Sequence, residues 1–192
     1  MADQVHRRGG HFHAVRFYED DAALCRLVTE FIGDGLAAGQ PGLVIATAAH
    51  RDGIVGGLRA LAFDVAALQE RGDLVLLDAE ETLATFMIDG VPDAAAFVHG
   101  VGGLLDRVAA RRSAATIRAY GEMVDCLWKR GAADSAIRLE VLWNQLADTR
   151  AFSLLCGYAM GNFYKHGAYE DICRQHSHVL TGAGQPTSIT VN

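Results

Sequence analysis

The chain has 192 residues, of which 51% are hydrophobic and 21% charged, a composition typical of one globular domain. Its 17 lysines and arginines against 23 aspartates and glutamates give a net charge of -6, which argues against direct nucleic-acid or membrane binding because both need excess positive charge. The sequence has no apolar run long enough to span a bilayer and no signal peptide, so we expect a cytoplasmic protein.

Strands and helices alternate along the chain. Apolar runs predict strands at residues 13–18, 43–47, 74–77, 116–120 and 152–158. Helical spacing predicts helices at about 21–38, 54–61, 80–84, 93–108, 123–128, 135–147 and 169–178. This order predicts an α/β fold, a three-layer sandwich with a mostly parallel central sheet of about five or more strands and helices on both faces. We expect a flexible arm at 1–12, one domain at 13–180 and a flexible tail at 181–192.

Ligands of open parallel sheets bind beyond the carboxyl ends of the strands. In this chain those ends carry polar, acidic and aromatic residues, among them Tyr18, Thr47, His50, Asp78, Tyr120, Glu122 and Tyr158. The first turn, FYEDDAALCRL, lacks the glycines and lysine that hold phosphates, and its acidic residues would repel an anion. We therefore expect no nucleotide binding at this turn and no cofactor.

Glu122 is the carboxylate with most functional interest, because it follows a buried strand. One interpretation is an acidic residue at the start of a helix, which the helix dipole favours. The other is a ligand contact, made by a carboxylic acid that apolar surroundings keep neutral and able to donate a hydrogen bond. The residue pattern alone leaves both open.

Several other residues also have two interpretations. His11, His13, His176 and His178 either bind a metal or are ordinary hydrogen-bonded histidines, and we favour the second, with no metal. Trp128 and Trp143 either fill the core or line a small apolar pocket. Cys156 either packs inside its strand or pairs with a histidine as a nucleophile. The four cysteines are scattered, so we expect free thiols.

Six stretches resemble the MEDS domain family and occur in that family's order over about residues 13–180: HAVRFYEDDAAL, FIGDGLAAGQPGLVIAT, LLDAEETLATFMIDGVPD, AYGEMVDCLW, LEVLWNQLA and FSLLCGYAM. The resemblance implies a domain that senses simple hydrocarbon derivatives in prokaryotic signalling and is often fused to histidine kinases, PAS domains or DNA-binding regions. It also implies a distant relationship to RecA-type and circadian-clock ATPases, Rossmann-like in architecture and with a degenerate P-loop.

Fourteen positions match the family pattern: His13, Tyr18, Gly35, Leu36, Gly39, Tyr120, Gly121, Glu122, Trp128, Glu140, Trp143, Asn144, Cys156 and Tyr158. The glycines are interpreted as structural. The polar and aromatic positions give the predicted ligand-binding set: Glu122, Tyr120, Tyr18, His13, Trp128, Trp143, Cys156 and Tyr158. No catalytic residue is expected.

The leading hypothesis is a stand-alone sensor that binds a small, mostly apolar molecule and regulates a separate signalling protein. That protein would be a histidine kinase, an anti-sigma factor or a transcription regulator, and the sequence leaves a homodimer open. The alternative is a ligand-free protein-interaction module in a kinase or sigma-factor pathway. A third hypothesis, an enzyme using Glu122 with Cys156 or a histidine, would need two titratable groups in contact within a pocket.

Overall fold

A computed structural model describes residues 12–111, 116–161, 169–180 and 186–188. Seven strands form one sheet: β1 (His13–Tyr18), β2 (Gly42–Ala46), β3 (Leu74–Asp78), β6 (Ile117–Gly121), β7 (Phe152–Ala159), β8 (His178–Leu180) and β9 (Pro186–Ser188). Their order is β3-β2-β6-β7-β1-β8-β9. All neighbours are parallel except β8 and β9, which are antiparallel. The carboxyl ends of six strands therefore lie at one edge of the sheet.

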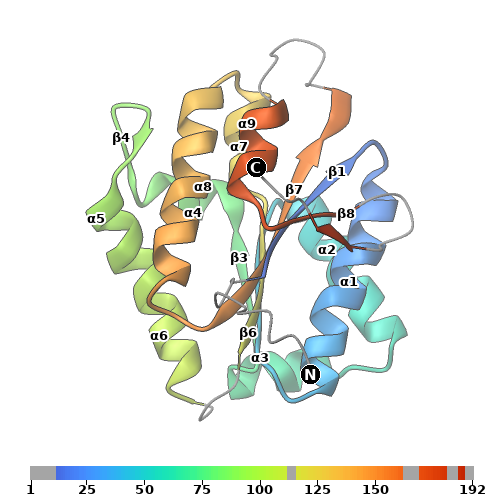
Figure 1. The fold of residues 1–192 in the computed structure, drawn as a ribbon. Coiled ribbons are helices and arrows are strands. Elements are labelled where there is room, and N and C mark those ends of the chain that lie inside the picture. The colour runs from blue at the N-terminus through green and yellow to red at the C-terminus, as the bar shows by residue number, and fades with distance from the viewer. Residues whose placement is uncertain (1–11, 112–115, 162–168, 181–185, 189–192) are drawn as a thin grey trace, which may run out of the picture.

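Helices cover both faces of the sheet (Figure 1). One face carries α1 (Asp21–Ala37), α2 (Ala48–Ala60) and α3 (Val65–Arg71). The other carries α4 (Ala79–Ala84), α5 (Ala94–Phe97), the π-helical turn η1 (Val98–Gly102), α6 (Gly103–Ala109), α7 (Met123–Lys129), α8 (Ala133–Ala147) and α9 (Tyr169–Gln175). A small hairpin, β4 (Met87–Ile88) with β5 (Val91–Pro92), precedes α5. The predicted α/β sandwich is thus confirmed.

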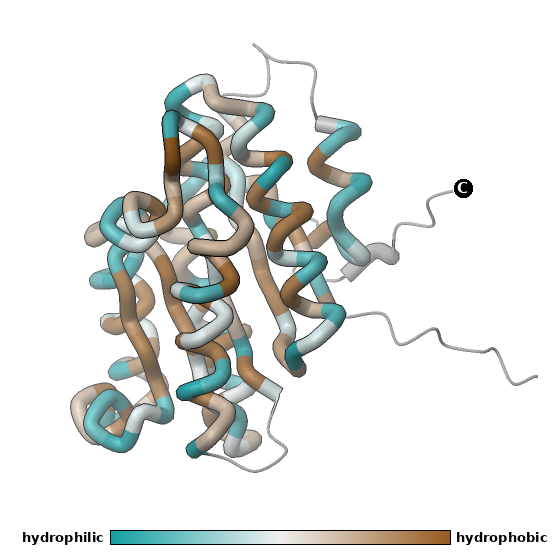
Figure 2. Tube along the Cα trace, turned by 90° about the vertical axis from the view of Figure 1, so that its left-hand side faces the viewer, coloured by the Kyte–Doolittle hydropathy of each residue, from teal (hydrophilic) through white to brown (hydrophobic). Residues whose placement is uncertain are grey.

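The sheet divides the core into two apolar layers. Strand β2 is buried along its whole length and contributes Leu43 and Ile45 to one layer and Val44 and Ala46 to the other. Side chains alternate across a strand, so a strand covered on both faces must be apolar throughout. The hydropathy colouring shows this as mainly brown strands between helices that alternate brown and teal (Figure 2).

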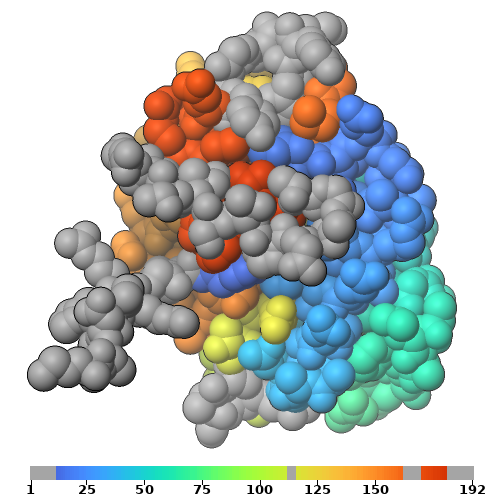
Figure 3. Space-filling model, turned by 45° about the vertical axis from the view of Figure 1, so that its right-hand side comes forward, coloured from blue at the N-terminus to red at the C-terminus, as the bar shows by residue number. Residues whose placement is uncertain are grey.

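The C-terminal part of the domain departs most from the sequence prediction. The helix expected at 169–178 ends at Gln175, and His178–Leu180 instead forms strand β8 beside β1. In the space-filling view this C-terminal segment, in red, lies on the outer surface beside the blue N-terminal elements (Figure 3). Three residues are too few to show a strand periodicity, so only pairing with β1 reveals the strand.

The sequence pattern also did not predict several other short elements. Helix α3 and the β4–β5 hairpin were not expected, and Leu61, assigned to the apolar stripe of α2, is 53% exposed. Residues 1–11 of the expected arm and residues 181–185 and 189–192 of the expected tail lie outside the described residues. Within that tail, Pro186–Ser188 forms β9. Every helix in the described ranges is too short or too polar to cross a membrane.

Helices α1 and α2 approach each other closely at two glycines of α2. A methyl carbon added at Gly57 would lie 2.5 Å from Thr29 Oγ1, and one added at Gly53 would lie 2.7 Å from Cys25 Sγ. Both distances are far below van der Waals contact, so each glycine gives α1 the space that a larger residue would occupy.

We expect Gly57→Ala to destabilise the protein by about 1–3 kcal/mol, because the β-branched Thr29 must move to admit the new methyl group. Gly56→Ala is the matched control, since nothing lies within 4 Å of its added carbon. Within a helix, alanine is more favourable than glycine by up to about 1 kcal/mol, so Gly56→Ala should be neutral or stabilising. Urea unfolding measures both, and equal stabilities for the two variants would contradict the close approach.

Candidate functional site

Glu122 lies where β6 ends and α7 begins, and its side chain is completely buried. Its Oε2 accepts the backbone N–H of Thr47 at 2.9 Å, and its Oε1 lies 2.7 Å from His50 Nδ1. The Thr47 hydroxyl lies 3.2 Å from both carboxyl oxygens. The side chain makes no capping hydrogen bond to α7. The carboxyl group therefore connects the end of β6 to the start of α2.

These contacts revise the expected chemistry of Glu122. A backbone N–H can only donate, so Oε2 acts as an acceptor. The carboxyl group thus accepts from donors at the start of α2 rather than from the first turn of its own helix. Glu122 is thus placed to hold His50 and the first turn of α2 in position.

His50 connects Glu122 to the surface. Its other ring nitrogen, Nε2, lies 3.4 Å from Oδ1 of Asp21, which is exposed at the start of α1. The hydrogen bond with Glu122 raises the pKa of His50 and outweighs burial, which acts in the opposite direction. The imidazole therefore lies between a buried carboxylate and an exposed one, and both favour its protonated form.

A second group of polar side chains lies at the ends of β1 and β7. The Tyr18 hydroxyl donates to Asp125 Oδ2 at 2.9 Å, and Asp125 Oδ1 accepts the backbone N–H of Ala159 at 2.9 Å. Lys129 Nζ lies 2.7 Å from Asp125 Oδ2 and 3.2 Å from the Tyr18 hydroxyl. Burial and Asp125 raise the pKa of Tyr18, so its hydroxyl stays protonated.

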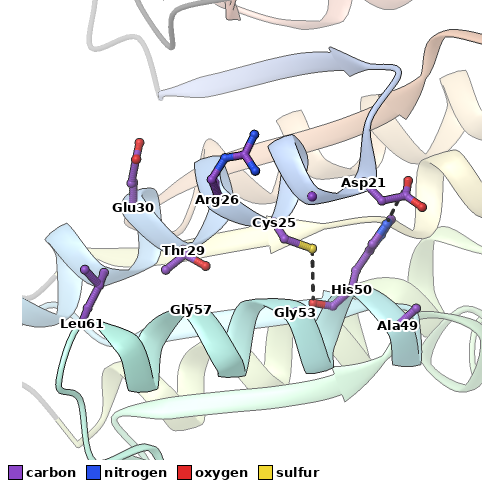
Figure 4. Close-up of a pocket in the computed structure, with 11 residues that line it drawn as sticks. Asp21, Cys25, Arg26, Thr29, Glu30, Ala49, His50, Gly53, Gly57 and Leu61 are labelled. Carbon is purple, nitrogen blue, oxygen red and sulfur yellow. Dashed lines mark hydrogen bonds and ion pairs between the residues drawn. The ribbon is translucent and has the colours of Figure 1, made fainter.

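A groove of about 500 Å³ opens between α1 and α2 and reaches His50. Its lining combines small or apolar residues with charged residues at the margin: Asp21, Ala22, Cys25, Arg26, Thr29, Glu30, Ala49, His50, Gly53, Gly57 and Leu61. In the close-up, Cys25 and Thr29 point from α1 toward the glycines of α2, while Asp21 and His50 meet at one end (Figure 4). The groove therefore places one titratable ring beside a mainly apolar surface.

A third polar group is buried on the opposite face of the sheet. His13 Nε2 lies 3.2 Å from Glu140 Oε2 and 3.4 Å from Cys156 Sγ. His176 Nε2 lies 3.4 Å from Glu140 Oε1, which also accepts the Tyr158 hydroxyl at 2.8 Å. Burial alone would raise the pKa of Glu140, but His176 and His13 outweigh it and hold that pKa below its usual range. This is the group of described residues whose donor atoms converge as metal ligands do.

The structure separates the predicted ligand-binding residues into two sets. Tyr18 and Tyr120 lie in the α1–α2 layer, and Glu122 is at the sheet edge beside them. The other set lies in the α7–α8 layer: His13, Trp128, Trp143, Cys156 and Tyr158. The sheet lies between the two sets, so the eight residues do not line one pocket.

The two tryptophans pack within the core. Trp128 meets the ring of Tyr158 edge to face with centroids 5.9 Å apart, and Trp143 meets Phe97 in the same way at 5.1 Å. Both indoles are almost completely buried. This favours the core-packing interpretation that the sequence left open.

Residues outside the predicted set complete both polar groups. His50 was recognised only as a polar residue after a strand, and Asp21 only as one of the acidic residues of the first turn. Glu140 and Asn144 matched the family pattern without an assigned role. His176 joins His13, as the metal interpretation required, whereas the ring of His178 stacks on Phe12 instead, with centroids 5.0 Å apart. His11 lies outside the described residues.

The cysteines beside these histidines are not activated as nucleophiles. Burial is the main cause that raises the pKa of both Cys25 and Cys156, so the unreactive thiol is favoured over the thiolate. Cys25 donates to the backbone carbonyl of His50 rather than to its ring. Cys156 does contact the ring of His13, but both side chains are buried, so a substrate has no direct approach to the thiol.

The chain was compared with known proteins. The family model described as MEDS, MEthanogen/methylotroph, DcmR Sensory domain, matches residues 12–177. A search of the curated proteins gives no match. The matched range contains the α1–α2 groove, the Glu122–His50 pair and the group around Glu140.

The raised pKa of His50 predicts a pH-dependent contribution to stability. A group whose pKa is higher in the folded state contributes fully below its unfolded value, here 6.5, and loses that contribution as the pH rises through the folded value. The difference in melting temperature between wild type and His50→Gln should therefore be largest below pH 6.5 and shrink at higher pH. The exposed His99, replaced by glutamine, is the control. A difference that stays constant with pH would contradict the Glu122–His50 coupling.

Proposed function

This chain belongs to the MEDS family of sensory domains, and we propose that it senses a small, mostly apolar molecule in the groove between α1 and α2. The observation that carries the proposal is a groove of about 500 Å³ that ends at His50, whose ring is held by the buried Glu122. Ligand sites typically combine an apolar lining with a few placed polar groups, in volumes of about 300–1,000 Å³.

The lining of the groove favours a small ligand with one polar group. Ala22, Ala49 and Leu61 supply apolar surface, and Gly53 and Gly57 line the groove without side chains of their own. The imidazole of His50 is the polar anchor that such a molecule would meet at the inner end. Halogenated hydrocarbons and short alcohols, thiols and amines have this combination of properties.

Glu122 offers a route from the groove to the rest of the domain. Its carboxyl group holds His50 and Thr47 at the start of α2, and its backbone carbonyl accepts the N–H of Asp125 in α7. Asp125 in turn binds Tyr18 and Lys129. A ligand that displaces His50 would therefore alter contacts at the starts of both α2 and α7. These contacts link α2 to α7. A ligand that binds one arrangement of the two helices better than another would shift the equilibrium toward that arrangement.

The output in this proposal is a changed surface that a signalling protein recognises, such as a histidine kinase, an anti-sigma factor or a transcription regulator. The activity in this proposal is binding rather than catalysis. The contact of His50 with Glu122 beside the groove supports the enzyme hypothesis, but the thiols of Cys25 and Cys156 are held in their unreactive form.

A protein-interaction module without a ligand is the second candidate. Its support is two exposed apolar side chains, Ile88 and Val91, which pair across the β4–β5 hairpin. Exposed apolar residues grouped in this way are typical of protein contacts. In this case the groove would have no role in signalling.

A thermal-shift screen of short alcohols, amines, thiols and halogenated hydrocarbons tests the sensor proposal. At about 100 times its Kd, a ligand stabilises the native state by about 2.7 kcal/mol, which corresponds to several degrees for a domain of this size. We expect at least one compound to raise the melting temperature of the wild type by this amount.

Two matched variants locate the ligand. Ala49 and Ala48 are both exposed in the first turn of α2, but of the two only Ala49 lines the groove. Ala49→Leu should abolish the thermal shift because the larger side chain enters the groove, whereas Ala48→Leu should retain it. A shift that survives Ala49→Leu places the ligand elsewhere, and a screen in which no compound acts favours the interaction module.

A further inference from the structure

The four side chains around Glu140 come from four separate segments of the chain. His13 starts β1, Glu140 lies in α8, Cys156 lies in β7, and His176 follows α9. All four are at least nine-tenths buried, and one potential ligand atom from each lies within 4.8 Å of the others. Two histidines, a carboxylate and a thiol are placed together in an otherwise apolar core layer, which requires a physical explanation.

The hydrogen bonds of the histidines fix their ring orientation. His176 Nδ1 lies 2.7 Å from the backbone carbonyl of Ile172, which can only accept, so Nδ1 carries the proton. His13 Nδ1 lies 2.8 Å from Asn144 Oδ1. The amide nitrogen of Asn144 donates to the Gln175 carbonyl at 2.9 Å, which fixes its oxygen toward His13. Both rings therefore donate through Nδ1 and turn Nε2 toward Glu140.

This arrangement is the one that metal-binding histidines adopt. In such sites one ring nitrogen binds the ion, and the other donates to a carbonyl or carboxylate that holds the ring in place. Both Nε2 atoms face Glu140, and the contact of His176 Nε2 with Glu140 Oε1, at 3.4 Å, is longer than a well-formed hydrogen bond. A positive ion at the centre would satisfy all of these atoms at once.

We infer that His13, Glu140, Cys156 and His176 form a binding site for a divalent transition-metal ion of the zinc type. Zinc prefers four nitrogen, sulfur and oxygen ligands in a tetrahedron, at about 2.0–2.3 Å. That geometry separates neighbouring ligand atoms by about 3.3–3.8 Å. In this group His13 Nε2 lies 3.2 Å from Glu140 Oε2 and 3.4 Å from Cys156 Sγ. Cys156 Sγ lies 3.6 Å from Glu140 Oε2, and His176 Nε2 lies 3.4 Å from Glu140 Oε1.

The charges also balance in this site. On binding, the Cys156 thiol releases its proton to solvent, and the thiolate and the Glu140 carboxylate together carry two negative charges, which a divalent ion neutralises. Tyr158 donates to the carboxylate and orients it. The bound ion would tie the segment after α9 to β1, β7 and α8, so metal binding would control whether this C-terminal segment stays attached to the sheet.

Refolding the full chain in the presence of Co²⁺ tests the site, because Co²⁺ replaces zinc and reports thiolate ligation by a charge-transfer absorption. We expect one Co²⁺ per chain after desalting, the thiolate absorption, and a higher melting temperature than for protein refolded with a chelator. Histidines that capture the ion elsewhere, such as His6 or His11, would give no thiolate absorption.

Matched variants assign the absorption to the site. Cys156→Ser should lose it, while Cys126→Ser, which changes another buried cysteine, should retain it. His176→Gln should weaken Co²⁺ binding by more than about tenfold, whereas His99→Gln should leave it unchanged. Circular dichroism checks that each variant is folded, and His176→Gln decides the outcome if Cys156→Ser does not fold. Absence of the absorption in the wild type, or its persistence in folded Cys156→Ser, overturns the inference.

Discussion

A carboxylate removed from water needs donors to replace the water it loses. Glu122 is completely buried and obtains its donors from the junction of β2 and α2. Because Glu122 itself belongs to the junction of β6 and α7, this requirement fixes two strand–helix junctions relative to each other. The position of His50, and with it the inner end of the α1–α2 groove, follows from the same requirement.

Glu140 meets the same requirement on the opposite face of the sheet, but its neighbours are of a different kind. Glu122 accepts the backbone N–H of Thr47, whereas Glu140 accepts the Tyr158 hydroxyl and faces the Nε2 atoms of His13 and His176. Strand β1 contributes to a polar group at each of its ends, since it carries His13 at its start and Tyr18, which donates to Asp125, at its end. The domain therefore holds two polar groups that the sheet keeps apart.

The alternation of apolar strands and amphipathic helices was enough to predict the layers of the fold, because both patterns extend over many residues. The division of the site was not predictable. Tyr120 and Cys156 both lie in strands, but their side chains point to opposite faces of the sheet. Side chains alternate between the faces along a strand, so the face depends on the register of the strand pairing. Tyr18 lies beside the ring of His50 and on the other face of the sheet from Tyr158, because of the strand order and register. No local sequence pattern encodes strand order or register. His178 was assigned to a helix because its strand is only three residues long.

The place of β1 in the sheet has a consequence for how the chain folds. Strand β1 lies between β7 and β8, so His13 pairs with Leu154 and Ala14 pairs with His178. Because β1 precedes both partners along the chain, it has no partner in the sheet until β7 has been synthesised. Pairings this distant in sequence slow folding, because the loop must close before any contact stabilises it. The nascent chain would therefore carry β1 as an unpaired strand while the segments between β1 and β7 are made.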